Sequence, residues 1–140
     1  MKPIILCVDD EKVILDSLKT QLKSAFGILY TYEMAESGID ALELIDELND
    51  EGQLIIVIVS DWLMPGMKGD ELLIKIHNRF PSVIKIMLSG QADEKAIERA
   101  FTQANLYKLL KKPWSEAELI GSICEAIQQL SILNHPKISE

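Results

Sequence analysis

Apolar residues along this chain follow two periods, one typical of buried strands and one typical of helices. Five short segments are nearly continuous apolar runs or rich in β-branched and aromatic residues, and they recur roughly every 25 residues, as βα units require. We expect strands at residues 3–8, 29–34, 54–60, 83–88 and 106–110. The first, third and fourth are the most apolar, which is typical of parallel strands covered on both faces. The second is more polar and is expected at an edge of the sheet.

Helical periodicity fills the intervals between these strands. The apolar stripes contain Ile14, Leu18 and Leu22; Ala41, Leu42 and Ile45; Leu72, Leu73 and Ile76; Ala96, Ile97 and Ala100; and Leu119, Ile123 and Ile127. Ser37 and Ser115 each precede an acidic residue at the spacing of a capping box, which predicts two helix starts. The pattern predicts a doubly wound α/β fold, (βα)5, with a five-stranded parallel sheet of order 2-1-3-4-5.

Composition limits the classes of function. The 140 residues suit one domain, which we expect to cover residues 1–131, with a tail or the start of a linker at 132–140. The net charge of −8 disfavours nucleic-acid binding. The longest apolar run, Leu54 to Val59, is too short to cross a membrane, and no signal peptide is visible, so we expect a cytoplasmic protein. Cys7 and Cys124 predict no disulfide framework or metal site and are expected to be buried or half-buried.

Polar residues suited to phosphate or metal chemistry end four of the predicted strands. Asp9 and Asp10 follow the first strand, Asp61 the third, Ser89 the fourth and Lys112 the fifth. The carboxyl ends of parallel strands lie at one edge of a sheet, where ligands bind at the switch point of the strand order. The sequence therefore predicts that three carboxylates, a hydroxyl and an ammonium converge there.

Three neighbouring carboxylates repel one another and favour a bound cation. Mg²⁺ prefers such oxygen ligands and commonly bridges them to a phosphate, so the cluster suits phosphoryl transfer, with one carboxylate as the candidate nucleophile. Each residue also has a simpler interpretation when taken alone. Asp10, for example, could cap the first helix, and Lys112 could be an ordinary loop residue. Their joint position favours a site.

Together, the segments ILCVDDE, VIVSDWLMPGMKGDELL, IMLSG and LLKKPW resemble the motifs of the response-regulator receiver domain of two-component signalling, over roughly residues 3–131. The resemblance implies that Asp61 is the phosphoacceptor. It implies that Asp10 binds Mg²⁺ directly, that Asp9 acts through water, and that the backbone carbonyl of Leu63 is a further ligand. The resemblance implies a signalling module that is not an enzyme, apart from dephosphorylation of its own Asp61.

The resemblance also implies roles for the residues that face the phosphoryl group. Ser89 and Lys112 match the hydroxyl and the ammonium that bind it, and the Lys112–Pro113 bond matches a position that is usually cis. The chain departs from the family at Leu109, where a switch tyrosine or phenylalanine is usual. Tyr107 should face the same side of that strand but lie further from the site.

The implied partners are a sensor histidine kinase or a phosphotransfer protein, and an output domain, fused or separate. The face of the fourth helix, fifth strand and fifth helix is the expected surface for output and for a homodimer. The segments SGQAD and KKPW resemble receivers fused to cyclic-dinucleotide phosphodiesterases.

Three alternatives remain open from the residues. A Mg²⁺-dependent phosphatase of the haloacid-dehalogenase type would need two aspartates spaced by one residue after the first strand, and here they are adjacent. A flavodoxin would need a hydroxyl-rich phosphate loop where this chain has Asp-Asp-Glu. A degenerate receiver that only binds partners would not need the complete acidic set.

Three further side chains, two tryptophans and a histidine, are interpreted separately. Trp62, beside Asp61, either rims the site or packs on the surface. Trp114 is interpreted as an anchor for the last helix, and His77 as an exposed residue without a phosphate role.

Overall fold

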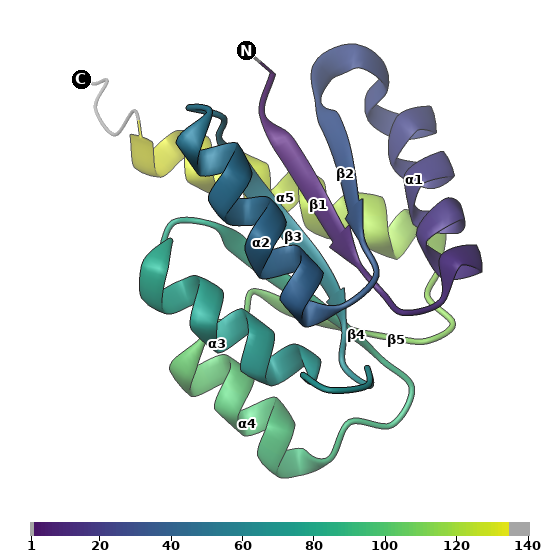
Figure 1. Cartoon of the computed structure of the whole chain (residues 1–140). Helices are drawn as coiled ribbons and strands as arrows, with labels where there is room; N and C mark the ends of the chain where they lie inside the picture. The colour runs from purple at the N-terminus through teal and green to yellow at the C-terminus, as the bar shows by residue number, and fades with distance from the viewer. Residues whose placement is uncertain (1, 135–140) are drawn as a thin grey trace.

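Strands and helices alternate along the whole described chain. The computed structural model describes residues 2–134 (Figure 1). Its elements are β1 (Ile4–Val8), α1 (Lys12–Phe26), the 3-10 turn η1 (Gly27–Leu29), β2 (Thr31–Ala35), α2 (Gly38–Asp50), β3 (Ile55–Asp61), α3 (Gly69–Arg79), β4 (Ile84–Ser89), α4 (Glu94–Gln103), β5 (Lys108–Lys111) and α5 (Glu116–Asn134). No helix among these residues has the length and apolar character needed to cross a membrane.

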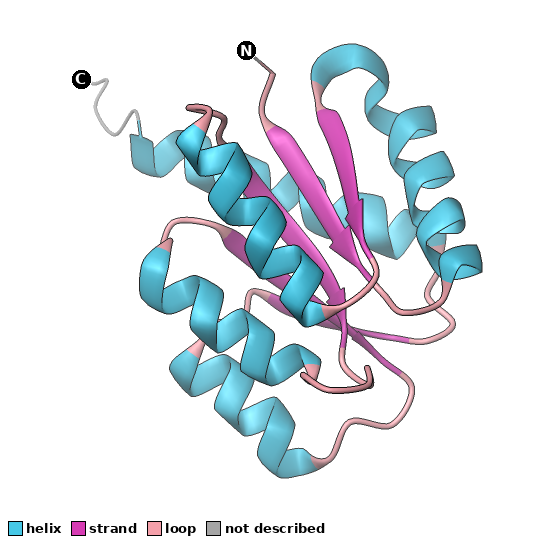
Figure 2. Cartoon of the chain, viewed as in Figure 1, coloured by secondary structure: helices cyan, strands magenta, loops and turns pink. Residues whose placement is uncertain are grey.

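The five strands form one parallel sheet of order β2-β1-β3-β4-β5, which confirms the predicted fold. Helices α2, α3 and α4 cover one face, and α1 and α5 cover the other (Figure 1). The layers enclose two cores, because β1, β3 and β4 are buried along almost their whole length. The strands end at a common edge, where the loops gather (Figure 2).

Side-chain caps begin three of the helices. Ser37 Oγ accepts from the Asp40 amide at 3.0 Å, and Ser115 Oγ accepts from the Glu118 amide at 3.0 Å, which confirms both predicted helix starts. Asp93 caps α4 in the same way. Capping of the first helix by Asp10 is wrong, because the N-cap of α1 is Glu11 and no side chain caps it.

Several boundaries and one burial prediction differ from the sequence-based expectation. β2 begins at Thr31, because residues 27–29 form η1. β5 begins at Lys108, although the Tyr107 amide already donates to the Lys85 carbonyl at 2.8 Å. Cys7 is buried as expected, which raises the pKa of its thiol to about 12, but Cys124 is exposed on α5.

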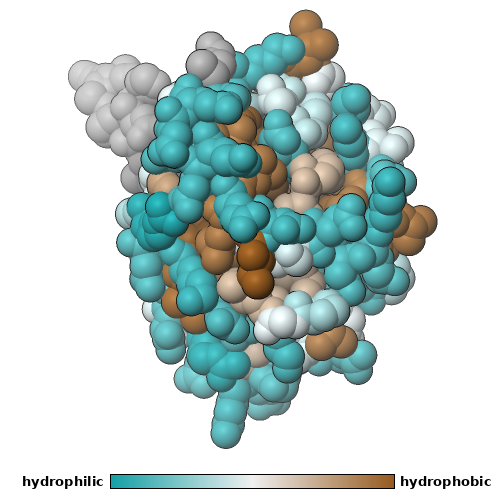
Figure 3. Space-filling model, in the orientation of Figure 1, coloured by the Kyte–Doolittle hydropathy of each residue, from teal (hydrophilic) through white to brown (hydrophobic). Residues whose placement is uncertain are grey.

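The expected domain boundary after residue 131 stays a prediction. It falls inside α5, which continues to Asn134, and most of the expected tail lies outside the described residues. The face formed by α2, α3 and α4 is mostly hydrophilic, with hydrophobic residues showing between hydrophilic ones (Figure 3).

Candidate functional site

The carboxyl edge of the sheet brings the three predicted aspartates together. Because β1 and β3 are adjacent and parallel, with Val8 opposite Ser60, the residues that follow reach the same level. One carboxylate oxygen from each of Asp9, Asp10 and Asp61 lies within 4.8 Å of the others. Asp9 is fully buried, Asp61 is 5% exposed and Asp10 is exposed. The cluster therefore opens to solvent on the Asp10 side.

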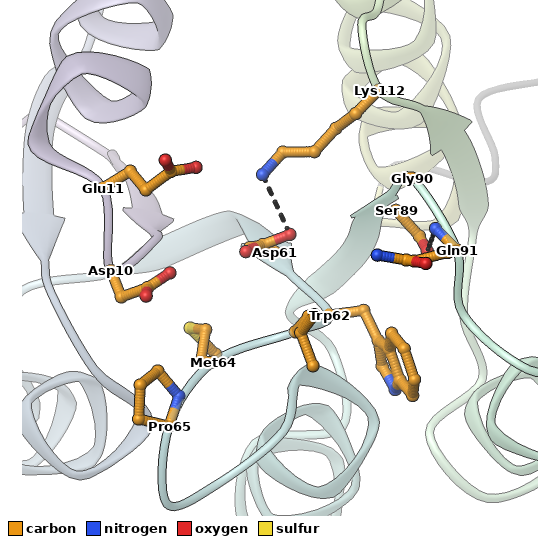
Figure 4. A pocket seen from close by; sticks show the side chains of 11 residues that line it. Asp10, Glu11, Asp61, Trp62, Met64, Pro65, Ser89, Gly90, Gln91 and Lys112 are labelled. Carbon is orange, nitrogen blue, oxygen red and sulfur yellow. Dashed lines mark hydrogen bonds and ion pairs between the residues drawn. The ribbon is translucent and has the colours of Figure 1, made fainter.

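Lys112 reaches into this cluster from the end of β5. Its Nζ lies 3.1 Å from Asp61 Oδ1 (Figure 4). The same Nζ lies 3.1 Å from Asp9 Oδ2. Its backbone amide donates to the Ser89 carbonyl at 3.1 Å, which fixes β5 against β4 at this level. The following bond to Pro113 is cis, as predicted.

The electrostatics of the site favour an additional cation. Burial raises the pKa of Asp61, the bond from Lys112 lowers it, and the charges of Asp9 and Asp10 raise it; the net shift is upward. Burial lowers the pKa of Lys112, but its contacts with Asp61 and Asp9 outweigh this, and the net shift is also upward. One ammonium therefore does not fully offset three carboxylates. Hard oxygen ligands with excess negative charge suit a divalent cation.

Asp9 and Asp10 differ in how many of their oxygens are free. Asp9 Oδ1 accepts from the Glu11 amide at 2.8 Å, and Oδ2 accepts from Lys112. No hydrogen bond involves the Asp10 side chain among the described residues. The two aspartates therefore offer different access to a cation, which agrees with the direct and water-mediated roles implied by the resemblance.

Ser89 lies on the opposite side of the pocket from Asp10 (Figure 4). Its Oγ accepts from the amides of Gln91 at 3.1 Å and Ala92, so it anchors the loop before α4. A hydroxyl has one donor and two acceptor positions. Both acceptor positions are used, and the O–H remains available to donate to an oxygen of a ligand.

The loop between β3 and α3 completes the pocket. Gly69 donates to the Trp62 carbonyl at 2.7 Å, and a Cβ at this position would meet the Asp61 carbonyl and lie 2.8 Å from Trp62 Cα. Only glycine permits this close approach. The open pocket has a volume of about 540 Å³. Its lining consists of Asp10, Glu11, Asp61, Trp62, Leu63, Met64, Pro65, Ser89, Gly90, Gln91 and Lys112.

Trp62 was predicted either to rim the site or to pack on the surface, and the structure shows a pocket residue that is buried. It lines the pocket, yet the residue is only 7% exposed and belongs to the core under α3 and α4. Its Nε1 donates to Asp70 Oδ1 at 3.0 Å, and Asp70 Oδ2 accepts from Arg99. Sequence reasoning missed Asp70 and Arg99. An acidic residue directly after Gly69 was the available signal, but it is equally typical of a first helical turn.

A buried lysine was also missed. Lys85 in β4 is 1% exposed, and its Nζ lies 2.7 Å from His77 Nδ1 and 3.3 Å from the Pro81 carbonyl. The prediction of an exposed His77 is wrong, because this contact holds it partly buried. Trp114 is partly buried, and its Nε1 donates to Gln21 Oε1 in α1 at 2.8 Å, which ties the start of the last helix to the first.

Comparison with known proteins places this geometry in context. A family model described as the response regulator receiver domain matches residues 5–124. The signal receiver domain of an HD domain-containing protein from Pseudomonas fluorescens Pf-5 superposes with a TM-score of 0.82 at 31% identity, covering 94% of this chain and 98% of that one.

Two longer curated proteins contain a similar segment. The hydrogenase transcriptional regulatory protein HoxA of Cupriavidus necator is 30% identical over 89% of this chain and 24% of its own length. The sensor kinase CckA of Brucella abortus is 31% identical over 89% of this chain and 12% of its own length. The chain thus spans a quarter or less of either relative.

Proposed function

Because this chain belongs to the response-regulator receiver domain family, we propose that Asp61 is the residue on which it accepts a phosphoryl group. Receiver domains act in two-component signalling as phospho-accepting modules, pair with histidine kinases and occur fused to output domains. One observation carries the assignment to Asp61. Its carboxylate lies at the switch point of the sheet, 3.1 Å from Lys112 Nζ and inside the acidic cluster.

The residues around Asp61 suit in-line transfer to a carboxylate. An oxygen of Asp61 attacks phosphorus, and the bond to the donor breaks as its electron pair leaves with the donor. Lys112 pairs with a phosphoryl oxygen, and the Ser89 O–H donates to another. Such positioned charges and donors supply most of the rate in phosphoryl transfer.

The same residues fit Mg²⁺. Asp10, Asp61 and the Leu63 carbonyl would hold it directly, and Asp9 would hold it through water, because Asp9 already binds Lys112 and a backbone amide. Bound Mg²⁺ would neutralise the carboxylates and the charge on the phosphoryl oxygens. The excess negative charge described above supports this assignment.

We propose a sensor histidine kinase or a phosphotransfer protein as the donor. The face formed by α4, β5 and α5 would carry the signal to an output domain or to a second copy of the chain. The domain belongs to a non-enzymatic family, and slow self-dephosphorylation at Asp61 is a further part of the proposal. A cytoplasmic location and the absence of nucleic-acid binding stay predictions.

Neither runner-up has a specific observation in its favour. A haloacid-dehalogenase-like phosphatase would place its nucleophile in a pair of aspartates spaced by one residue after β1, whereas Asp9 and Asp10 are adjacent, and both oxygens of the fully buried Asp9 are already bonded. A degenerate receiver that only binds partners would not need Asp9, Asp10, Asp61, Ser89 and Lys112 together.

Mass spectrometry after incubation with acetyl phosphate and Mg²⁺ tests the assignment. The protein should gain one phosphate, and Asp61→Asn should gain none. Asp16→Asn, an exposed aspartate on α1, is the matched control and should behave as the wild type. Undiminished phosphorylation of Asp61→Asn would show that the acceptor is elsewhere, and undiminished phosphorylation in excess chelator would exclude the role of Mg²⁺.

A further inference from the structure

Three side chains form a continuous hydrogen-bonded network, Trp62–Asp70–Arg99, that leads from the pocket to α4. Trp62 Nε1 donates to Asp70 Oδ1 at 3.0 Å, and Asp70 Oδ2 accepts from Arg99 Nε at 3.1 Å and Nη2 at 2.9 Å. Asp70 is 4% exposed, so both of its oxygens are bound away from water. A buried carboxylate is costly to separate from its donors, so the Trp62–Asp70–Arg99 network resists displacement of any one of its three side chains.

The Trp62–Asp70–Arg99 network begins at the residue directly after the proposed phosphoacceptor, Asp61. Trp62 stands between Asp61 and Leu63, the two residues to which a carboxylate ligand and a carbonyl ligand for Mg²⁺ are assigned. Its backbone is fixed on both sides, because its amide donates to the Leu88 carbonyl at 2.9 Å and its carbonyl accepts from Gly69. Its indole points away from Asp61 (Figure 4). A shift of the ligand-bearing backbone must therefore move the indole or strain its bond to Asp70.

The network ends at Arg99, in the middle of α4. This helix is also tied to the site at a second point. The loop before α4 is anchored by Ser89 Oγ through the amides of Gln91 and Ala92. Arg99 holds the body of the helix to Asp70 at the start of α3, beside which α4 lies (Figure 1). The position of α4 thus depends on Ser89 at one end of the helix and on the Trp62–Asp70–Arg99 network at its centre.

We propose that Trp62, Asp70 and Arg99 are positioning residues that couple the occupancy of the Asp61 site to the position of α4. The proposal rests on the proposed function and adds a route for its signal. This route does not pass through position 109, where the usual switch aromatic is replaced by Leu109. Coupling between two sites is reciprocal, so removing a bond of the Trp62–Asp70–Arg99 network should also weaken the binding of Mg²⁺ between Asp61 and Leu63.

The test uses NMR to measure both ends of the Trp62–Asp70–Arg99 network, the Mg²⁺ site and α4. Backbone amide shifts of residues 94–103 are followed while Mg²⁺ and then beryllofluoride, a phosphoryl mimic, are added to the wild type, Trp62→Phe, Asp70→Asn and Arg99→Gln. Each variant should lose more than half of the wild-type shift change on α4, and its Mg²⁺ affinity should fall about two- to tenfold. Arg99→Lys keeps a charge for Asp70 and should restore part of the response.

Arg79→Gln is the matched control, because Arg79 also joins α3 to a neighbouring helix, through Asp46 of α2 at 2.6 Å, but is not connected to the site. It should respond as the wild type does. A full α4 response with unchanged Mg²⁺ affinity in Arg99→Gln would overturn the coupling and leave the phosphoacceptor assignment intact. Absence of any response in the wild type would overturn both. Arg99 is half exposed, so its variant decides the matter even if Asp70→Asn does not fold.

Discussion

Two lysines show how the two ends of the sheet differ: Lys112, partly buried directly after β5, and Lys85, fully buried in the adjacent strand β4. Lys112, at the carboxyl end of β5, lies 3.1 Å from each of two carboxylates, and its pKa is raised. Lys85, near the amino end of β4, contacts only an imidazole nitrogen and a carbonyl, and burial lowers its pKa to about 8. The same ammonium is stabilised at one end and penalised at the other, because only one end provides opposite charge.

The contrast separates function from folding. At the carboxyl edge, the carboxylates of Asp9 and Asp61 carry more negative charge than the single ammonium of Lys112 neutralises. An open pocket beside them leaves room for a ligand. Below α3, Lys85 Nζ and His77 Nδ1 lie 2.7 Å apart, and neither residue lines the pocket at the carboxyl edge. His77 has a lowered pKa because of burial and the neighbouring Lys85 charge. The first arrangement is suited to binding, and the second only affects stability.

Replacing Lys112 should have the largest effect. In Lys112→Met, phosphorylation by acetyl phosphate should slow by about a hundredfold or more, the usual result of removing a positioned donor to a developing charge. The fold should also lose about 1–3 kcal/mol, because two buried carboxylates lose their partner. Rates followed by intact mass, with urea unfolding on the same samples, measure both. Equal phosphorylation rates in Lys112→Met and the wild type would remove the distinction drawn between the two lysines.

Lys85→Met should do the opposite near neutral pH: phosphorylation stays normal and stability is equal or higher, because a poorly compensated buried charge is removed. Since the pKa of Lys85 is lowered from 10.5 to about 8, the unfolded state binds more protons between these values. Wild-type stability should therefore rise with pH across this window, by up to roughly 3 kcal/mol, and this contribution should be constant below the window, where Lys85 is protonated in both states.

The difference between wild type and variant isolates this contribution from other titrating groups. Urea unfolding at pH 7, 8, 9 and 9.5 should give a wild-type curve that approaches the Lys85→Met curve as pH rises. Parallel curves across this range would show that Lys85 titrates at its ordinary value in the folded protein.

Which of these lysines could be predicted from sequence follows from their surroundings. Lys112 follows an apolar strand and precedes a proline, at the level of Asp9 and Asp61, so strand order alone placed it in the site. Lys85 lies inside the apolar run of the fourth strand, where the pattern predicts burial but contains no sign of its partner. His77 is near it only through the packing of α3 on β4, a contact between elements that periodicity does not specify.

The same limit applies to Trp62, Asp70 and Arg99. Strand order depends on short-range patterning and on general rules of connection, and it was predicted correctly. The bond between Asp70 and Arg99 depends on how far α4 is rotated and shifted against α3. Ser89 was placed in the site, but its two bonds to loop amides depend on the path of residues 90–92, for which the sequence contains no distinct signal.

Substitutions of the two adjacent aspartates should sharpen the comparison at the carboxyl edge. Asp10→Ala should weaken Mg²⁺ binding by about tenfold and more than Asp9→Ala, because Asp10 is exposed and unbonded whereas Asp9 is occupied by Lys112 and the Glu11 amide. Asp9→Ala should instead lower stability more, since it takes one of two partners from Lys112. Magnesium titrations followed by amide shifts, with urea unfolding alongside, distinguish the two, and the reverse ranking would exchange their proposed roles.

Leu109→Ala should have the smallest effect on signalling, although it changes the residue three positions before Lys112. Leu109 is partly buried at the edge of the core under α4 and has neither a hydroxyl nor a ring with which to report the state of the site. Its truncation should cost about 1–2 kcal/mol, below the range for a fully buried leucine. The amide shifts of α4 and α5 on adding beryllofluoride should remain close to wild type, whereas Ser89→Ala should blunt them, because that change removes both the donor to the phosphoryl group and the anchor of the loop before α4. Loss of the response in a folded Leu109→Ala, with Ser89→Ala normal, would place the signal on β5 and not on the β4–α4 loop.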